Sequence, residues 1–320
     1  MRDHGGNIDG AMARYGGRAG EWIDLSTGIN RVPYPLPPLP PEAWTALPTR
    51  AATEALIAAA RAAYGAPAAI LPVAGAQAAI QMIPRLGRPG RARVLGPTYN
   101  EHAGSLAAAG WQVTEVADPA ALEGADLAVI VNPNNPDGRR QKPDALLALA
   151  GRVGRLVVDE SFADPAPELS LAARAGRPGL FVLRSFGKFY GLAGLRLGFV
   201  LGDKTEIAAL SGMAGPWPVA GAAIEVGRVA LSDRAWAAAT ITRLQAETAR
   251  IDGLALRAGW ALVGGCALFR LYDTGNATAA QERLARNRIW SRIFPYSERW
   301  LRLGLPGSEA EWARLEQALR

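Results

Sequence analysis

Lysine is scarce in this sequence, in which three lysines stand against thirty-two arginines among 320 residues. Cysteine occurs once, at Cys266, which excludes an internal disulfide framework and a cysteine-rich zinc site. With only two histidines, His4 and His102, a histidine-based metal site is not expected either. No run of about 18 apolar residues occurs, and the first residues lack the apolar segment of a secretory signal. We therefore expect a cytoplasmic protein with no membrane partner.

The charge balance is basic but carries no sign of nucleic-acid binding. The formal net charge is +6 and the pI is near 9.8. The arginines are scattered, with no long basic run and no nucleic-acid motif, so we expect no nucleic-acid partner. Apolar residues make up 49% of the chain, which indicates a globular protein with a sizeable core. A basic balance also suits an anionic substrate.

The order of the apolar segments predicts an α/β fold with three parts. Residues 1–50 are rich in Gly and Pro and are expected to form an arm, followed by a large domain at 51–217 and a small domain at 218–320. Continuous apolar runs joined by helical crossovers favour a mostly parallel sheet in the large domain, and the small domain is expected to be α+β. The expected strands are 92–96, 111–116, 126–131, 155–159, 180–184, 195–201, 262–271 and 301–305. Helices are expected at 53–64, with Thr53 as N-cap, and at 219–231, 234–258, 278–286 and 308–319.

One of the three lysines lies in a glycine-bearing segment, Ser185-Phe-Gly-Lys188-Phe-Tyr-Gly-Leu-Ala-Gly-Leu-Arg196. A lysine amine can form a reversible imine with an aldehyde. Ser185 and Arg196 flank Lys188 and are candidate phosphate ligands, and this combination is what a pyridoxal phosphate site requires. Taken alone, Lys188 has a simpler explanation as a surface lysine in a glycine-rich loop.

Further candidates follow strands elsewhere in the large domain. Gly75-Ala76-Gln77 opens a helix, where backbone N–H groups bind phosphate. Tyr99 follows a strand and could stack on a flat ring, and Asn135 lies in a loop with two Asn-Pro steps. Asp159 ends a strand, where a carboxylate could keep a pyridine nitrogen protonated. Separately, each feature has a common structural explanation, as a turn, a half-buried tyrosine or a loop cap.

In the order Gly-loop, Tyr99, Asn135, Asp159, Lys188 and Arg196, these residues resemble fold-type-I pyridoxal phosphate enzymes of the class I/II aminotransferase superfamily, over roughly residues 50–305. The resemblance implies that Gly75, Ala76, Gln77, Ser185 and Arg196 hold the cofactor phosphate. It implies that Tyr99 stacks on the ring, Asn135 binds the ring hydroxyl, Asp159 binds the pyridinium and Lys188 carries the cofactor. It also makes Arg302 the ligand of a substrate carboxylate, places His102 behind Asp159, and implies a homodimer.

Within the superfamily, the N-terminal motifs His4-Gly-Gly-Asn7 and Leu25-Ser-Thr-Gly-Ile-Asn30 resemble a decarboxylase branch of cobalamin biosynthesis that acts on a phosphorylated amino acid. Phe162 agrees, because aminotransferases of this group usually carry a tyrosine there. The resemblance implies that His4, Asn7 and Asn30 contact the substrate. Leu47 and Pro306 replace residues that relatives use near the substrate, which leaves Arg31, Arg50, Arg184 and Arg299 as possible phosphate ligands. An aminotransferase acting on histidinol phosphate or an aromatic amino acid, and a non-catalytic protein of this fold, remain alternatives.

Overall fold

The computed structural model describes residues 4–320, and by its internal contacts the chain divides into two compact units. The larger unit comprises Tyr34–Asn135 and Arg140–Ala237, and the smaller unit comprises the residues up to Pro33 together with Pro136–Arg139 and Ala238–Arg320. Helix α10 (Arg234–Arg257) contributes residues to both units. The domain boundaries expected from the sequence, at residues 50 and 217, remain a prediction.

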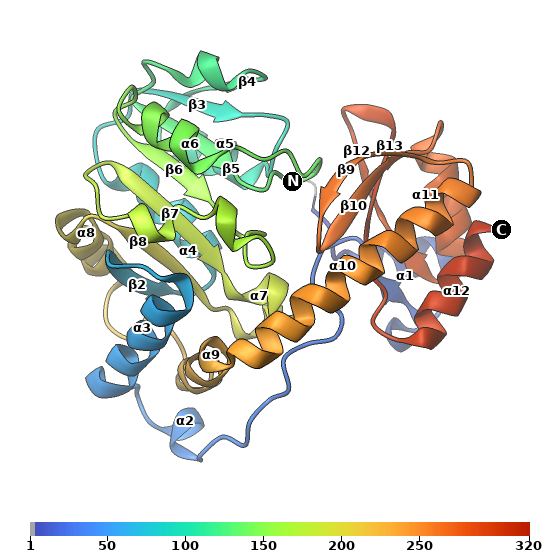
Figure 1. The fold of residues 1–320 in the computed structure, drawn as a ribbon, viewed down its shortest axis with the longest axis horizontal. Coiled ribbons are helices and arrows are strands. Elements are labelled where there is room, and N and C mark those ends of the chain that lie inside the picture. The colour runs from blue at the N-terminus through green and yellow to red at the C-terminus, as the bar shows by residue number, and fades with distance from the viewer. Residues whose placement is uncertain (1–3) are drawn as a thin grey trace. The chain divides into compact units, whose positions relative to one another are not determined.

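A seven-stranded sheet in the order β2-β8-β7-β6-β5-β3-β4 forms the centre of the larger unit (Figure 1). Its strands are β2 (Ala69–Val73), β3 (Arg91–Leu95), β4 (Gln112–Val116), β5 (Leu127–Val131), β6 (Leu156–Asp159), β7 (Leu180–Ser185) and β8 (Gly198–Gly202). Strands β3 to β7 pair in parallel, and β8 runs antiparallel to both β2 and β7. The expected mostly parallel sheet is therefore confirmed, although β2 was not expected as a strand.

Eight α-helices lie wholly within the described part of the larger unit. They are α2 (Glu42–Thr45), α3 (Arg50–Tyr64), α4 (Ala76–Met82), α5 (Glu101–Ala108), α6 (Pro143–Ala150), α7 (Phe186–Phe189), α8 (Lys204–Ala214) and α9 (Gly221–Ser232). Short 3-10 turns occur at Ile83–Arg85, Pro119–Leu122, Pro167–Leu169, Ala172–Arg174 and Ala193–Leu195. The expectation that Thr53 caps α3 is wrong, because the Thr49 side chain accepts from the Ala52 N–H at 3.1 Å and starts the helix one turn earlier.

The strands in the middle of this sheet are buried on both faces, which explains their unbroken apolar sequence. Leu127, Val129 and Phe181 are at most 2% exposed and belong to one core cluster with residues of α4 and α8. The last expected strand of this unit starts later than predicted, at Gly198 rather than Leu195. Ala193–Leu195 form a 3-10 turn, and Arg196 has a left-handed φ of 52°, so the chain cannot be extended there.

The smaller unit is α+β, as expected. Its four-stranded antiparallel sheet has the order β12-β13-β10-β9, and a separate parallel pair joins β1 to β11. Its remaining elements are α1 (Ile8–Tyr15), a 3-10 turn at Ala19–Glu21, β1 (Ile23–Asp24), β9 (Ala261–Cys266), β10 (Phe269–Asp273), α11 (Ala277–Arg286), β11 (Ile289–Trp290), β12 (Arg292–Phe294), β13 (Ser297–Gly304) and α12 (Glu309–Leu319).

One expectation for the smaller unit needs correction. Residues 262–271 were expected as one strand and instead form the β9–β10 hairpin, which turns between Cys266 and Phe269. The first part of the expected arm packs within this unit, since Trp22 is 6% exposed and contacts Ala11 and Ala285. An N-terminal helix and a two-residue strand give too short an apolar pattern to be recognised against a Gly- and Pro-rich background.

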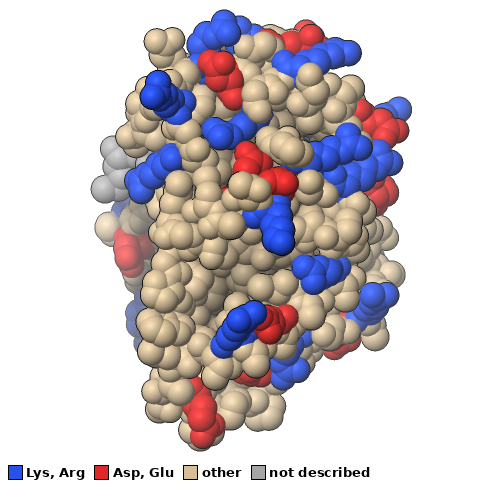
Figure 2. All heavy atoms as spheres, turned by 90° about the vertical axis from the view of Figure 1, so that its left-hand side faces the viewer, with Lys and Arg blue, Asp and Glu red and all other residues tan. Residues whose placement is uncertain are grey.

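The surface in Figure 2 shows basic and acidic side chains interspersed, so this face carries no continuous basic stripe. Several arginines of the larger unit form surface ion pairs, among them Arg91 with Asp126 and Arg152 with Glu123. Throughout residues 4–320, every helix is too short or too polar to cross a membrane. The basic side chains that raise the pI are therefore scattered over the surface, and several of them are paired with carboxylates.

We expect Leu127→Ala to destabilise the protein by about 2–5 kcal/mol, because it opens a cavity in the core cluster under the central sheet. Leu256→Ala provides the control, since that leucine is 73% exposed and its loss should change stability by less than about 0.5 kcal/mol. Urea unfolding followed by circular dichroism measures both. Equal midpoints for the two variants would contradict this description of the core.

Candidate functional site

The carboxyl ends of three neighbouring parallel strands bring the candidate residues of the larger unit to one edge of its sheet. Val131 at the end of β5 pairs with Asp159 at the end of β6, and Asp159 pairs with Leu183 of β7. The Asn132 N–H donates to the Asp159 carbonyl at 2.8 Å, which fixes the start of the loop that carries Asn135. Ligand sites of α/β proteins lie at such strand ends.

Asp159 is almost fully buried, with 2% exposure, and makes three hydrogen bonds with two residues. Its Oδ2 lies 2.8 Å from His102 Nε2, and its Oδ1 accepts from the Ser161 N–H at 2.9 Å and the Ser161 hydroxyl at 2.5 Å. Burial alone would raise the pKa of Asp159, but the bonds from His102 and Ser161 outweigh it and hold the pKa below its ordinary value. Asp159 is therefore an ionised carboxylate at neutral pH. His102 lies behind it, as the resemblance implied.

Four of the five expected phosphate ligands lie close together: Gly75, Ala76, Ser185 and Arg196. Gly75, with φ of 75°, precedes the first residue of α4, and a Cβ atom placed on it would be 2.6 Å from Arg196 Nη2. Ser185 pairs with Gly198 across β7 and β8, and a Cβ atom on Gly198 would be 2.4 Å from the Ala76 nitrogen. The first N–H groups of a helix have no acceptor within the helix, so they are available to an anion. A glycine on either side, a hydroxyl and a guanidinium around these N–H groups suit a phosphate.

Tyr99 lies between this group and Asp159. Its hydroxyl donates to Gln77 Oε1 at 3.3 Å, and its ring meets the His102 ring edge-on with centroids 6.1 Å apart. Gln77 in turn donates to the buried Glu101 at 2.9 Å. Gln77 therefore contributes its side chain to orienting Tyr99, a role that its place in the Gly-loop did not reveal.

Lys188 and Asn135 lie in the segments that follow β7 and β5, at the same edge of the sheet. Lys188 lies in α7, directly after β7, and its Nζ is 5.8 Å from the centre of the buried Phe162 ring. Asn135 is half-buried. Its neighbour Asn134 holds the loop in place by accepting from the Thr98 hydroxyl at 2.6 Å. The residues around this edge fit pyridoxal phosphate, since they offer an amine, a phosphate cradle and a buried carboxylate.

The expected carboxylate ligand, Arg302, lies in the smaller unit. It is 4% exposed, donates to the Ser26 carbonyl, and its guanidinium lies 5.1 Å from the centre of the Phe269 ring. Its partner across the sheet is Arg292 of β12. Burial, with a contribution from the charge of Arg292, lowers the pKa of Arg302 to about 10. An anion bound at Arg302 would relieve both effects.

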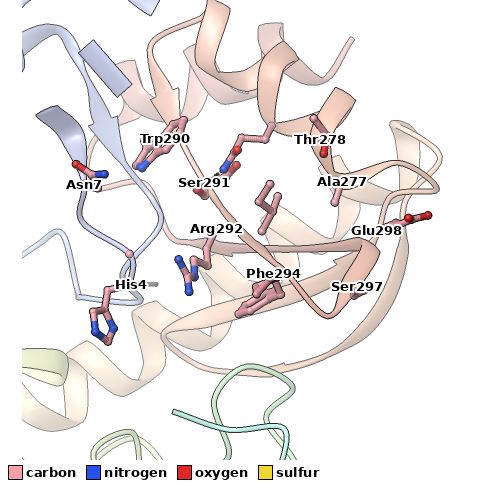
Figure 3. Close-up of a pocket in the computed structure, with 14 residues that line it drawn as sticks. His4, Asn7, Ala277, Thr278, Trp290, Ser291, Arg292, Phe294, Ser297 and Glu298 are labelled. Atoms are coloured by element: carbon pink, nitrogen blue, oxygen red, sulfur yellow. Dashed lines mark hydrogen bonds between the residues drawn. The ribbon is translucent and has the colours of Figure 1, made fainter. Parts of the chain in front are cut away.

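A cavity of about 440 Å³ in the smaller unit contains two of the three expected arm residues (Figure 3). His4 and Asn7 line it, and so does Arg292, which reaches from β12 toward the segment that carries His4. Asn7 also caps α1 by accepting from the Gly10 N–H at 2.9 Å. Asn30 is not among the lining residues. Its Oδ1 accepts from Val32 N–H at 3.1 Å and from Arg243 at 2.8 Å.

The sequence analysis did not identify Arg292 as a candidate ligand. The four arginines that it considered as phosphate ligands each form an ion pair with a carboxylate. Arg31 pairs with Glu311, Arg50 with Glu54, Arg184 with Glu160 and Asp164, and Arg299 with Asp273. Sequence spacing does not reveal the pairing of Arg292 with Arg302, because the register shifts between Ile293 and Phe294, and a regular hairpin would place Arg299 opposite Arg292. Within residues 4–320, no group of three or more His, Cys, Asp or Glu side chains is placed to hold a metal ion.

Comparisons with known proteins show which family this chain resembles. A family model described as aminotransferase class I and II matches residues 41–319. A threonine-phosphate decarboxylase from Pseudomonas aeruginosa is 46% identical, with alignment over 100% of this chain and 97% of that protein. A second threonine-phosphate decarboxylase, from Sinorhizobium sp, is 44% identical over 99% of this chain and 97% of its own length.

A solved structure gives the same fold at lower identity. Histidinol-phosphate aminotransferase from Sinorhizobium meliloti, in complex with pyridoxal-5'-phosphate, has a TM-score of 0.82 and is 21% identical. The match covers 97% of this chain and 93% of that one.

We expect inorganic phosphate to raise the thermal midpoint of the pyridoxal phosphate-loaded protein, because an anion relieves the repulsion between Arg292 and Arg302. At a phosphate concentration 100 times its Kd, the stabilisation is about 2.7 kcal/mol. Arg292→Gln should lose most of this shift. The control is Arg299→Gln on β13, whose guanidinium is exposed and paired with Asp273, and which should keep it. An unchanged shift in Arg292→Gln would show that phosphate binds elsewhere.

Proposed function

The chain belongs to the aminotransferase class I and II family, and from that premise we propose that it is a pyridoxal phosphate-dependent decarboxylase. Its substrate is L-threonine O-3-phosphate, and its products are (R)-1-aminopropan-2-yl phosphate and carbon dioxide. The observation that carries the substrate is the 46% identity, over the whole chain, to a protein named threonine-phosphate decarboxylase. As part of the same proposal, we assign the reaction to cobalamin biosynthesis and to the cytoplasm.

Eight residues of the larger unit, besides Lys188, have a proposed role toward the cofactor. When bound, pyridoxal phosphate supplies an aldehyde for imine formation and a ring that accepts the electron pair left behind as a carboxylate departs. Gly75, Ala76, the Gln77 backbone, Ser185 and Arg196 would hold its phosphate. Tyr99 would stack on the ring and Asn135 would donate to the ring hydroxyl. Asp159, ionised and fixed by His102, keeps a proton on the pyridine nitrogen.

Lys188 has two proposed roles. Its amine carries the cofactor before substrate arrives, and afterwards its Nζ delivers the proton that replaces the departed carboxylate at Cα. The ring of Phe162, close to this amine, offers no hydroxyl. A tyrosine at this position, as aminotransferases of the group usually have, would add a donor near the ring oxygen. Its absence supports the decarboxylase over the aminotransferase.

The smaller unit supplies the proposed ligands for the two anionic ends of the substrate. Arg302 binds the α-carboxylate through its planar fork of donors. Arg292, with His4 and Asn7 from the same cavity, binds the phosphate. The role of Asn30 as a substrate ligand remains a prediction, because its Oδ1 accepts hydrogen bonds from Arg243 and from the Val32 N–H. The carboxylate is also the leaving group, so Arg302 must position it without stabilising it too strongly before it departs.

An aminotransferase acting on histidinol phosphate or an aromatic amino acid is the second candidate, favoured by the family and the shared fold. Product analysis separates the two. Purified holoenzyme is incubated with threonine phosphate, and carbon dioxide and keto acid are assayed in parallel. The proposal expects one carbon dioxide per substrate and no amino-group transfer to 2-oxoglutarate. If the cofactor converts to its pyridoxamine form with glutamate and histidinol phosphate turns over faster, the aminotransferase takes its place.

Lys188→Ala should abolish covalent attachment of the cofactor, because no other described lysine lies in this site: Lys142 precedes α6 and Lys204 begins α8. Borohydride reduction followed by mass spectrometry of the intact chain measures the attachment. Lys204→Ala is the matched control and should retain the label. A labelled Lys188→Ala protein would refute the assignment.

Asp159→Asn should keep bound cofactor but lose roughly 3 kcal/mol of transition-state stabilisation, or about 10²-fold in kcat. An amide cannot hold the pyridine nitrogen in its charged form, so the ring accepts electrons less well. Steady-state decarboxylation at saturating threonine phosphate measures this. A rate close to that of the wild type would mean that another group supports the nitrogen.

We propose a homodimer. The exposed large apolar side chains of the larger unit include Trp44 at 70%, Leu47 at 64% and Trp217 at 55%, and α2, which carries Trp44, packs on α9 shortly after Trp217. Trp44→Ser with Trp217→Ser should shift the mass measured by light scattering toward the monomer. Leu256→Ser, at an exposed site of the smaller unit, should not. A wild-type monomer with full activity would contradict the dimer.

A further inference from the structure

A buried ion-pair cluster lies directly beside the strand ends that carry the cofactor-binding candidates. Arg184, the penultimate residue of β7, is 4% exposed, and Glu160, which follows β6, is fully buried. Arg184 Nη1 lies 2.8 Å from Glu160 Oε2, and its Nη2 lies 2.6 Å from Asp164 Oδ1. The roles proposed above leave all three residues unused.

Two of the three residues in this cluster are adjacent in sequence to a cofactor-binding candidate. Glu160 follows Asp159, and Arg184 precedes Ser185. The two strands are held in register, since Asp159 pairs with Leu183 and the Glu160 N–H donates to the Leu183 carbonyl at 2.9 Å. Because side chains alternate along a strand, Arg184 points to the face opposite Ser185. The ion pairs therefore link the ends of β6 and β7, which lie side by side in Figure 1, through side chains on the face opposite Ser185.

The cluster also fixes the chain on either side of it. The Glu160 carboxylate accepts from the Ser170 hydroxyl at 2.5 Å and from the Leu171 N–H at 2.6 Å. The Arg184 guanidinium stacks over the Tyr64 ring of α3, 4.4 Å from its centre. The Arg184 guanidinium therefore contacts the segment 160–164 and Tyr64 of α3, and Glu160 links the same segment to Ser170 and Leu171. The planar fork of the guanidinium permits only a narrow range of geometries.

Burying two carboxylates and one guanidinium is costly, and an apolar or neutral replacement of such a group is often as stable. Burial raises the pKa of both Glu160 and Asp164, against the opposing charge of Arg184. A cluster of this kind adds little to net stability. Its value lies in fixing one arrangement of the groups around it.

We propose that Arg184 is a positioning residue, which sets the spacing between Asp159 on β6 and the Ser185–Lys188 segment after β7 through its ion pairs with Glu160 and Asp164. This inference rests on the proposed function only in that Asp159, Ser185 and Lys188 are taken to bind the cofactor. If it is right, loss of the cluster weakens the grip on the cofactor and slows the reaction, while substrate binding by the smaller unit is preserved.

The test is a triple variant, Arg184→Met with Glu160→Gln and Asp164→Asn, which removes every charge of the cluster together and leaves none buried alone. We expect it to fold, to release pyridoxal phosphate from the holoenzyme about 10- to 100-fold more readily, and to lose kcat by a similar factor. The KM for threonine phosphate should change little. Arg184→Lys, which can keep one ion pair, should recover part of the cofactor affinity.

Arg155→Met is the matched control at the opposite end of the same strand. Arg155 precedes β6 and lies 3.4 Å from Glu206, which also accepts from the N–H of Gly179 just before β7. This substitution removes an ion pair that links the starts of the same two strands. It should therefore lower the thermal midpoint without changing cofactor release. Equal cofactor release in the two variants, or a triple variant that matches the wild type in release and kcat, would overturn the proposal. If the wild-type protein fails to decarboxylate, the release comparison still decides it.

Discussion

The parallel register of β5, β6 and β7 is the constraint on which the rest of this site depends. It places the Asn135 loop, Asp159 and the Lys188 helix at one edge, although these residues are far apart in the sequence. A shift of one residue in any strand would turn Asp159 or Ser185 to the opposite face. The apolar strands hold this register because each is buried on both sides.

Within that frame, one carboxylate is kept charged in a place where burial opposes charge. Asp159 has little contact with water, and His102 and Ser161 supply the hydrogen bonds that water would otherwise give. The group is thus prepared before any ligand arrives, which is how electrostatic support lowers a barrier without reorganisation. In the same way, the proposed role of the Arg184 cluster is to fix the relative positions of β6 and β7 before a ligand binds.

The sequence predicted the larger unit well because its signals are local. A strand followed at once by Asp159, or by Ser185 and Lys188, can be read from neighbouring residues. The α/β class, the parallel sheet and the cofactor followed from such segments. Arg292 could not be found in this way, because its importance arises from antiparallel pairing with Arg302 and from a cavity shared with His4, almost 290 residues earlier. Likewise, nothing local shows that Arg243 engages Asn30, or that Arg184 is buried between two carboxylates.

In the proposed function, the chemistry takes place at the strand ends of the larger unit, and Arg292 and Arg302 of the smaller unit recognise the substrate. The ratio of kcat/KM for threonine phosphate to that for threonine tests this division most directly, in wild type and in Arg292→Gln. We predict a large preference for the phosphorylated substrate in the wild type. In the variant, the preference should collapse by at least about tenfold, the effect of one charge-assisted hydrogen bond worth roughly 1.5–3 kcal/mol, while the rate with threonine stays the same. A preference that survives the substitution unchanged would contradict it.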